Sequence, residues 1–495
     1  MFARLERMWF SVGGATCHSA CVPTCRRFVL PGASSRPPIV NSSALAGGDR
    51  NSLTYNTIKP DRTAPHRTLS GSAVLYDVPS RPCSFTPARH RFYDSDWIEL
   101  MTIEATRRSP AAGLLIVPKA FYFFWFVALG TFGPFIVLHY RNVGLDLAQI
   151  GLLLSLGGIL QAAGPLWGLL ADALRLRRIL LPIAVVGTLI PAALLGQVSA
   201  FWQIFTLTTI ISLFAIPITP LADSATLAAL GNARERYGAQ RVWGAVGWGL
   251  STVLSGWLIQ RLGLSLIFWA YPIAGGLAAL AALAMPRAEL ATVNVVQAGR
   301  TLLCDRRWAR FLISATLIGC SGALVHGFFS LYMEDLGAGG EQIGLAYTIA
   351  SISELPVMAL SALALRRWGA RPLMVTAGLA YALRMLLYWV APSPEWALAI
   401  QLLHGLCFAS LWTAGVVEAQ RLAPPGLEAT AQSLFGTAVF GIAVALANAI
   451  GGVIYRDYGY GALFAAAAFA ALVGAGGLAF GAPEEREPYS GEQQP

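Results

Sequence analysis

The stretch that decides the fold reads Asp223-Ser-Ala-Thr-Leu-Ala-Ala-Leu-Gly-Asn-Ala-Arg-Glu-Arg-Tyr-Gly-Ala-Gln-Arg241. Its centre, Gly231 to Arg234, is a polar turn between two apolar segments, and Asp223 and Arg241 are equally far from Asn232. In helices that rise about 1.5 Å per residue, each charge lies about 13 Å from the turn. Both charges then lie inside a bilayer core of roughly 30 Å. The stretch predicts a transmembrane helical hairpin with a carboxylate and a guanidinium at one depth.

Ionisable groups at that depth are costly, usually face the interior of a helix bundle, and mark a substrate or proton pathway. Asp223 and Arg241 are therefore candidate substrate-binding residues. A purely structural ion pair is the alternative interpretation. The same alternative applies to the second charged group described below.

The composition indicates that this hairpin is part of a polytopic membrane protein. Of the 495 residues, 56% are hydrophobic and 12% are charged, whereas soluble domains carry roughly 25% charged residues. The net charge of +9 arises from short basic clusters between apolar runs. Such clusters act as topology markers, so nucleic acid is not an expected partner. Cys17, Cys21 and Cys25 match no metal-binding spacing, so no metal site is expected.

Apolar segments recur along the chain and predict twelve transmembrane helices. They cover approximately 114–139, 149–171, 179–197, 203–229, 240–260, 265–285, 309–332, 342–365, 372–391, 396–419, 431–454 and 461–481. Arginines concentrate in alternate loops, which places those loops and both termini in the cytoplasm. The expected location is the cell inner membrane.

The longest inner loop, 287–308, divides the predicted bundle into two halves, 110–286 and 309–482, each with six segments. A cytoplasmic tail, 483–495, follows. The inner loops after segments two and eight also correspond: Gly168-Leu-Leu-Ala-Asp-Ala-Leu-Arg-Leu-Arg-Arg178 and Ser361-Ala-Leu-Ala-Leu-Arg-Arg-Trp-Gly-Ala-Arg371. This pattern is typical of parallel repeats with a binding site between them at mid-depth. The expected fold class is an all-α polytopic membrane protein with two six-helix pseudo-repeats.

Residues 1–100 differ from the rest of the chain. They are rich in Ser, Pro, Arg and Thr and contain no apolar run that could span a membrane, so we expect disorder. Met101 opens a short basic lead into the first helix. We therefore expect Met101 to be the true start of translation, and a genuine regulatory tail is the alternative.

From about residue 110 to 482 the chain resembles the major facilitator superfamily. The loop that contains Asp172 and Arg177 is similar to the acidic loop motif of that superfamily, although Ala173 and Arg175 stand where an Arg and a Gly are usual. The resemblance implies a gating role for Asp172 and Arg177, in which this loop docks the two halves in the outward-facing state.

Segment five begins Tyr237-Gly-Ala-Gln-Arg-Val-Trp-Gly-Ala-Val-Gly-Trp248. It resembles the same helix in the lactose permease branch and its oligosaccharide and nucleoside relatives. The resemblance implies that Asp223 and Arg241 bind sugar hydroxyls and that Trp248 stacks on the ring. Core packing of Trp248 is the alternative. Tyr122 on segment one and His326 on segment seven are further candidates for lining the site.

The second half contributes three more charged or titratable residues. Glu354 and Arg384 have their midpoint at Gly369, and Arg384 and His404 have theirs at Pro394. Hairpins centred on these turns place all three side chains on adjacent helices near mid-depth, about 15 Å from each turn or somewhat further.

These three residues resemble the acidic residue, arginine and histidine of the proton-coupling half of lactose permease. The tracts Ser353-Glu-Leu-Pro356 and Gln401-Leu-Leu-His-Gly405 are similar to the phenylpropionate-permease-like branch. Cys407 stands where lactose permease has a carboxylate. Proton coupling is therefore expected from Glu354 balanced by Arg384, with help from His404. A bridging polar role for His404 is the alternative.

The expected function is secondary transport: proton-coupled symport of a sugar, nucleoside or aromatic acid by alternating access. The proton is the coupling ion, and no other cofactor is expected. A drug or metabolite exporter and a non-transporting membrane sensor are the alternatives. An enzyme is not expected, because no nucleophile elbow or phosphate loop is visible. We expect a monomer in the lipid bilayer that binds a small molecule.

Overall fold

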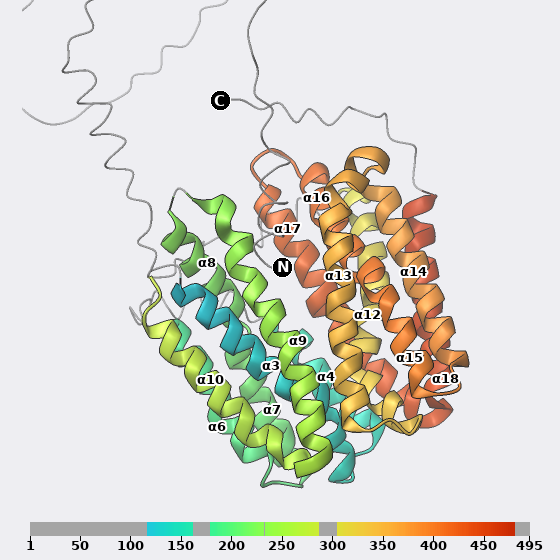
Figure 1. The fold of residues 1–495 in the computed structure, drawn as a ribbon. Coiled ribbons are helices and arrows are strands. Elements are labelled where there is room, and N and C mark those ends of the chain that lie inside the picture. Colours follow the sequence, from blue (N-terminus) through green and yellow to red (C-terminus); the bar gives the residue numbers. More distant parts are fainter. Residues whose placement is uncertain (1–115, 162–178, 232, 287–303, 481–495) are drawn as a thin grey trace, which may run out of the picture. The chain divides into compact units, whose positions relative to one another are not determined.

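The computed structural model describes residues 116–161, 179–231, 233–286 and 304–480, and the regular elements in these ranges are helical (Figure 1). The first part contains α3 (Ile116–Asn142), α4 (Leu147–Leu160), α6 (Leu180–Leu195), α7 (Phe201–Ala215), α8 (Ile218–Leu230), α9 (Tyr237–Leu262) and α10 (Ile267–Leu283). The second part contains α12 (Arg306–Asp335), α13 (Gly340–Trp368), α14 (Ala370–Val390), α15 (Pro394–Ile400), α16 (His404–Leu422), α17 (Glu428–Thr437) and α18 (Ala443–Ala479).

Nine helices in the described ranges are long and apolar enough to cross a membrane. In three of them, two consecutive α-helices form one span: α7 with α8, α15 with α16, and α17 with α18. The last span covers 52 residues and bends at Gly459, whose φ of 80° is not helical. The helices α4 and α6 are shorter. The prediction of an all-helical membrane fold is confirmed. The predicted extension 1–100 and most of the linker lie outside the described residues.

Two glycines form the turns that the sequence predicts. Gly231 ends α8 with a φ of 54°, and Gly369 lies between α13 and α14 with a φ of 84°. Side chains with a Cβ rarely adopt this left-handed region, so glycine is the favoured residue where a helix stops and the chain reverses. The two resulting hairpins are the scaffold that holds the predicted charges.

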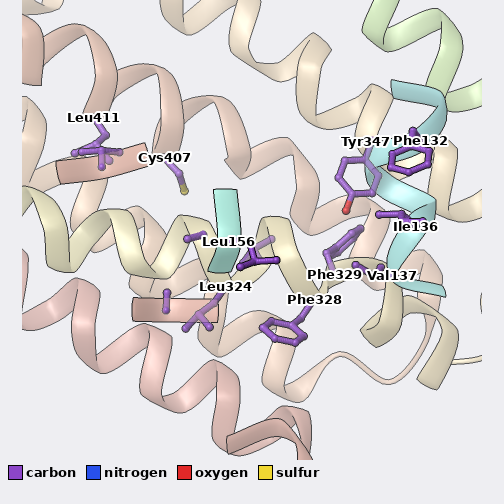
Figure 2. Packing of buried hydrophobic residues seen from close by; sticks show 14 of the residues in the cluster. Phe132, Ile136, Val137, Leu156, Leu324, Phe328, Phe329, Tyr347, Cys407 and Leu411 are labelled. Atoms are coloured by element: carbon purple, nitrogen blue, oxygen red, sulfur yellow. The ribbon is translucent and has the colours of Figure 1, made fainter. Parts of the chain in front are cut away.

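Within each part, the helices pack around a core rich in aromatic side chains. In the first part, α3 packs against α9 and α10; in the second, α12 packs against α18 and α14 also packs against α18. The core is continuous across the two parts. Figure 2 shows Phe132 and Ile136 of α3 in one buried cluster with Phe329 of α12 and Tyr347 of α13.

The two parts meet along two helix pairs, α4 with α18 and α9 with α13. Glycine allows both close approaches. A Cβ on Gly151 would lie 2.4 Å from the carbonyl oxygen of Asn448, and a Cβ on Gly344 would lie 2.1 Å from that of Thr252. The Oγ1 atoms of Thr252 and Thr348 are 2.8 Å apart and link α9 to α13. These contacts use the last half of α9 and the first halves of α4 and α13, so they gather at one end of the bundle, which we call the joined end.

Four polar side chains add a clasp at the joined end. Arg141, in the last turn of α3, lies 3.0 Å from Glu334 and 2.6 Å from Asp335 at the end of α12. The hydroxyl of Tyr455 on α18 donates to the second oxygen of Asp335 at 2.5 Å. We call Arg141, Glu334, Asp335 and Tyr455 the end clasp. It ties the first part of the chain to two helices of the second.

Candidate functional site

The predicted pair from the first part is in contact. Nη1 of Arg241 on α9 lies 3.3 Å from Oδ1 of Asp223 on α8. The same Oδ1 accepts a hydrogen bond of 2.6 Å from the hydroxyl of Tyr122 on α3. The Arg241 guanidinium also lies 5.3 Å from the centroid of the Tyr122 ring and 5.4 Å from that of Phe126. Three helices therefore converge on one carboxylate.

This cluster combines a buried supporting side chain with charged groups that are accessible to water. Tyr122 is buried and fixes Asp223, whereas the side chains of Arg241 and Asp223 keep 37% and 32% of their surface exposed. The contact between Arg241 and Asp223 uses a single guanidinium nitrogen. Other nitrogens of the planar guanidinium are available to a carboxylate or hydroxyl on a ligand.

Tyr237 is a residue of this cluster that the sequence reasoning missed. Its phenol interacts electrostatically with both Asp223 and Arg241. Tyr237 precedes Arg241 by four residues in α9, and residues with that spacing lie on the same face of a helix. The i, i+4 spacing was the available signal.

The three residues predicted in the second part form a hydrogen-bonded row. Nε2 of His404 lies 2.9 Å from Oε1 of Glu354, and Nδ1 of His404 lies 2.9 Å from Nη1 of Arg384. Arg384 also donates to the side-chain oxygen of Gln401 and, from Nε, to the hydroxyl of Tyr388 at 3.2 Å. The polar groups Gln401 and Tyr388 were not predicted as site residues.

The chemistry of the donors fixes the tautomer of His404 in this row. A guanidinium has only donors, so Nδ1 of His404 must accept from Arg384. A neutral imidazole then carries its proton on Nε2 and donates it to Glu354. The observed geometry therefore assigns a neutral His404 between a cation and a carboxylate oxygen that accepts a hydrogen bond.

The structure differs from the sequence expectation in one respect. We expected Glu354 and Arg384 to balance each other directly, but His404 lies between them. The reason is the helix order, because α16 packs against both α13 and α14. Glu354 and His404 keep about a fifth to a quarter of their side-chain surface exposed (22% and 24%), whereas Arg384 is 1% exposed. The row therefore runs from an accessible carboxylate to a buried cation.

An irregular helix segment orients the side chains of this row. Residues Gln401–Leu403 form a 3-10 turn between α15 and α16, and side chains three residues apart align in such a turn. Gln401 and His404 therefore both reach Arg384. The hydroxyl of Ser353, next to Glu354 on α13, accepts the backbone N–H of Gly405 at 2.9 Å. This bond ties the irregular segment to the helix that carries the carboxylate.

Aromatic rings connect the two parts of the chain beside these clusters. Trp248 of α9 stacks against His326 of α12 with ring centroids 6.3 Å apart and planes 24° apart. Tyr347 of α13 meets both rings edge-on. His326 is exposed and Trp248 is half-buried. The structure thus brings two predicted residues together across the halves. Asp172 and Arg177 lie outside the described residues.

This helical bundle, with its charged clusters formed between helices, belongs to the class of polytopic membrane transporters of the major facilitator superfamily. Residues 115–466 match the model of the MFS_1 like family, and the chain belongs to this family. The maltose permease of Geobacillus stearothermophilus is 30% identical over 74% of this chain and 93% of its own length. The probable 3-phenylpropionic acid transporter of Escherichia coli K12 is 24% identical over 69% of this chain and 91% of its own. The predicted family resemblance is confirmed.

Solved structures share the fold. The nucleoside transporter NupG is 20% identical, with a TM-score of 0.65 over 74% of this chain and 98% of the NupG chain. A D-xylose-proton symporter is 15% identical, with a TM-score of 0.59 over 75% of this chain and 97% of that one.

Proposed function

We propose that this protein is a proton-coupled symporter that moves a small organic solute by alternating access. The observation that carries the proposal is the pair of accessible charged clusters, Asp223–Arg241 in the first part and Glu354–His404–Arg384 in the second. One cluster is built to hold a ligand, and the other to hold a proton. The solute class is a sugar, nucleoside or aromatic acid, in line with the maltose permease, the probable 3-phenylpropionic acid transporter and the nucleoside transporter that the chain resembles.

The proposed architecture has twelve spans in two repeats. The nine apolar spans give ten when the last is divided at Gly459, and α4 and α6 supply the remaining two. Helix packing supports the repeat. In the first half, α7 packs against both α4 and α6. In the second half, α16 packs in the same way against α13 and α14, which are the proposed equivalents of α4 and α6. We place both termini in the cytoplasm of a monomer in the cell inner membrane, on the strength of the arginine-rich alternate loops.

In this orientation the joined end faces outward, and the conformation corresponds to an inward-facing form. The contacts between α9 and α13 reach inward to Thr348 and Gly249, where the two residues share a hydrogen bond of 2.7 Å. The partial exposure of Asp223, Arg241, Glu354 and His404 fits access from the other end. Rocking of the two halves would then expose the site to each side in turn.

The substrate side of the mechanism uses Arg241 as a donor and Asp223 as an acceptor. Tyr122 holds the carboxylate in place through its 2.6 Å hydrogen bond, so the pair keeps its geometry when the ligand leaves. Trp248, two turns along α9 from Arg241, offers a ring face for a sugar or aromatic ring.

The coupling side uses the orientation of His404. A proton on Glu354 removes the negative charge that the Nε2–H of His404 faces. A proton on Nδ1 of His404 would abolish its acceptor and break the contact with Arg384. Proton binding therefore weakens the row at Glu354, whose neutral acid is a poorer acceptor, or breaks it at His404. We propose that this change is linked to substrate binding and to the rocking motion.

The direct test is substrate-induced proton uptake in proteoliposomes, with sugars, nucleosides and aromatic acids as candidate substrates. A symporter makes the external medium more alkaline when its substrate enters. An antiporting exporter gives the opposite sign, and a sensor gives substrate binding with no flux. Either of those two results would overturn the proposal.

Arg241→Lys is expected to weaken substrate affinity by roughly 10- to 100-fold, because an ammonium group cannot make a paired, planar contact with a carboxylate or a diol. The measurement is the half-saturating concentration in substrate counterflow. Arg261→Lys is the matched control on the same helix, since Arg261 stacks on Trp257 at 3.8 Å near the end of α9. Equal affinities in the two variants would remove Arg241 from the site.

A further inference from the structure

A groove between the start of α12 and the end of α18 is lined by arginines and apolar side chains, and the proposed transport mechanism uses none of these residues. Its cavity volume is about 370 Å³. Arg306, Arg310, Ile313 and Leu317 form one stripe of α12 along it, and Val473 and Gly477 line the facing side of α18. Two cations therefore stand at one end of a groove that is otherwise apolar.

The length of α12 places this groove across a membrane interface. A helix of 30 residues is about 45 Å long, which exceeds a bilayer core of roughly 30 Å. Its first turns, with Arg306 and Arg310, therefore lie at the level of lipid headgroups, and Ile313 and Leu317 lie at the level of the acyl chains. Ile313 is 62% exposed.

The guanidinium groups of Arg306 and Arg310 form no ion pair with the described part of the protein. Over the described ranges, no carboxylate lies within ion-pair distance of Arg306 or Arg310. One carbonyl at the end of α18, that of Leu478, accepts from Arg371 of α14. The N-terminus of α12 adds a positive helix dipole beside both arginines.

Close packing of α12 against α18 forms the bottom of the groove. Gly477 of α18 lies close to Ser314 of α12, since a Cβ on Gly477 would be 2.5 Å from Oγ of Ser314. A chain that lies in the groove therefore rests on backbone and small side chains between Ile313, Leu317 and Val473.

We propose that this groove binds one anionic phospholipid of the surrounding leaflet. The headgroup phosphate lies between Arg306 and Arg310 at the start of α12, and one acyl chain follows Ile313, Leu317 and Val473. Basic pockets between transmembrane helices recognise anionic headgroups in this way. This inference is independent of the transported solute and of proton coupling.

The test is native mass spectrometry of the full chain in detergent, titrated with phosphatidylglycerol and with phosphatidylcholine. We expect the parent protein to retain phosphatidylglycerol. Binding should be roughly 30-fold weaker when Arg306→Gln and Arg310→Gln are combined, since each interfacial arginine contributes roughly fivefold to the affinity for an anionic lipid. The matched control combines Arg366→Gln and Arg367→Gln, an exposed basic pair in the last turn of α13. Val473→Trp, which fills the groove without changing charge, is expected to expel the lipid as well.

Three results would overturn the proposal. Phosphatidylglycerol retained equally by the groove and control variants would show non-specific attraction to basic residues. Displacement of the lipid by millimolar inorganic phosphate would show a free anion site. Binding that appears only after deletion of residues 483–495, which include Glu484, Glu485 and Glu487, would show that the acidic tail is the natural occupant.

Discussion

Glu354→Gln is expected to abolish uphill uptake while substrate exchange continues. A symporter that carries one proton can accumulate substrate up to about tenfold per unit of pH gradient. The amide cannot take up the proton but still offers an oxygen to Nε2 of His404, which lies 2.9 Å from Oε1 in the parent. Accumulation should therefore fall to the level of passive equilibration, whereas counterflow of labelled substrate remains.

Glu395→Gln is the matched control for this variant. Glu395 is an exposed carboxylate at the start of α15, where it accepts from Gln342 and Ser393. It lies on the same span as His404 but outside the row. Uphill uptake by Glu354→Gln at the level of Glu395→Gln would refute the assignment of Glu354 as the proton carrier.

Gly405→Ala is expected to disable coupling through packing alone. A Cβ at this position would lie 2.0 Å from the carbonyl oxygen of Ser353 and 2.4 Å from its carbonyl carbon. Backbone atoms cannot rotate away, so α13 and α16 must separate, and overpacking of this kind costs about 1–3 kcal/mol. Separation lengthens the contact between Glu354 and His404, which lie on these two helices. We expect a lower melting temperature and lost accumulation.

Gly436→Ala provides the comparison for Gly405→Ala. Gly436 is also helical, in α17, but the nearest atom to its added Cβ would be Trp412 at 3.9 Å. That distance is an ordinary contact, so stability and accumulation should match the parent. Normal transport by Gly405→Ala would mean that the close approach of α13 and α16 is not needed for the row.

The hairpin geometry explains which parts of the site were predictable. Helix rise and turn position alone set the depth of a residue in a span. Asp223 and Arg241 are equidistant from their turn and do meet, and the midpoint at Gly369 coincides with a left-handed turn. Depth was therefore readable from the sequence, because glycine and polar residues mark the turns.

Lateral neighbours were not predictable in the same way. The position of His404 between Glu354 and Arg384 depends on which helix packs beside which, and this order follows from small-residue contacts such as Gly405 with Ser353. The stacking of Trp248 on His326 similarly joins residues whose sequence separation carries no distance information. The roles of all these residues in transport stay predictions, as do those of Asp172 and Arg177.

The end clasp has a consequence for how the protein responds to its medium. Arg141, Glu334 and Asp335 are partly exposed to water, unlike Arg384. Exposed ion pairs contribute at most about 1 kcal/mol each and are screened over roughly 8–10 Å at physiological ionic strength. The bias toward the joined arrangement should therefore weaken as salt is added, whereas the glycine contacts beneath it do not change. Ionic strength would then set how readily the joined end opens, with no change in the affinity of the site itself.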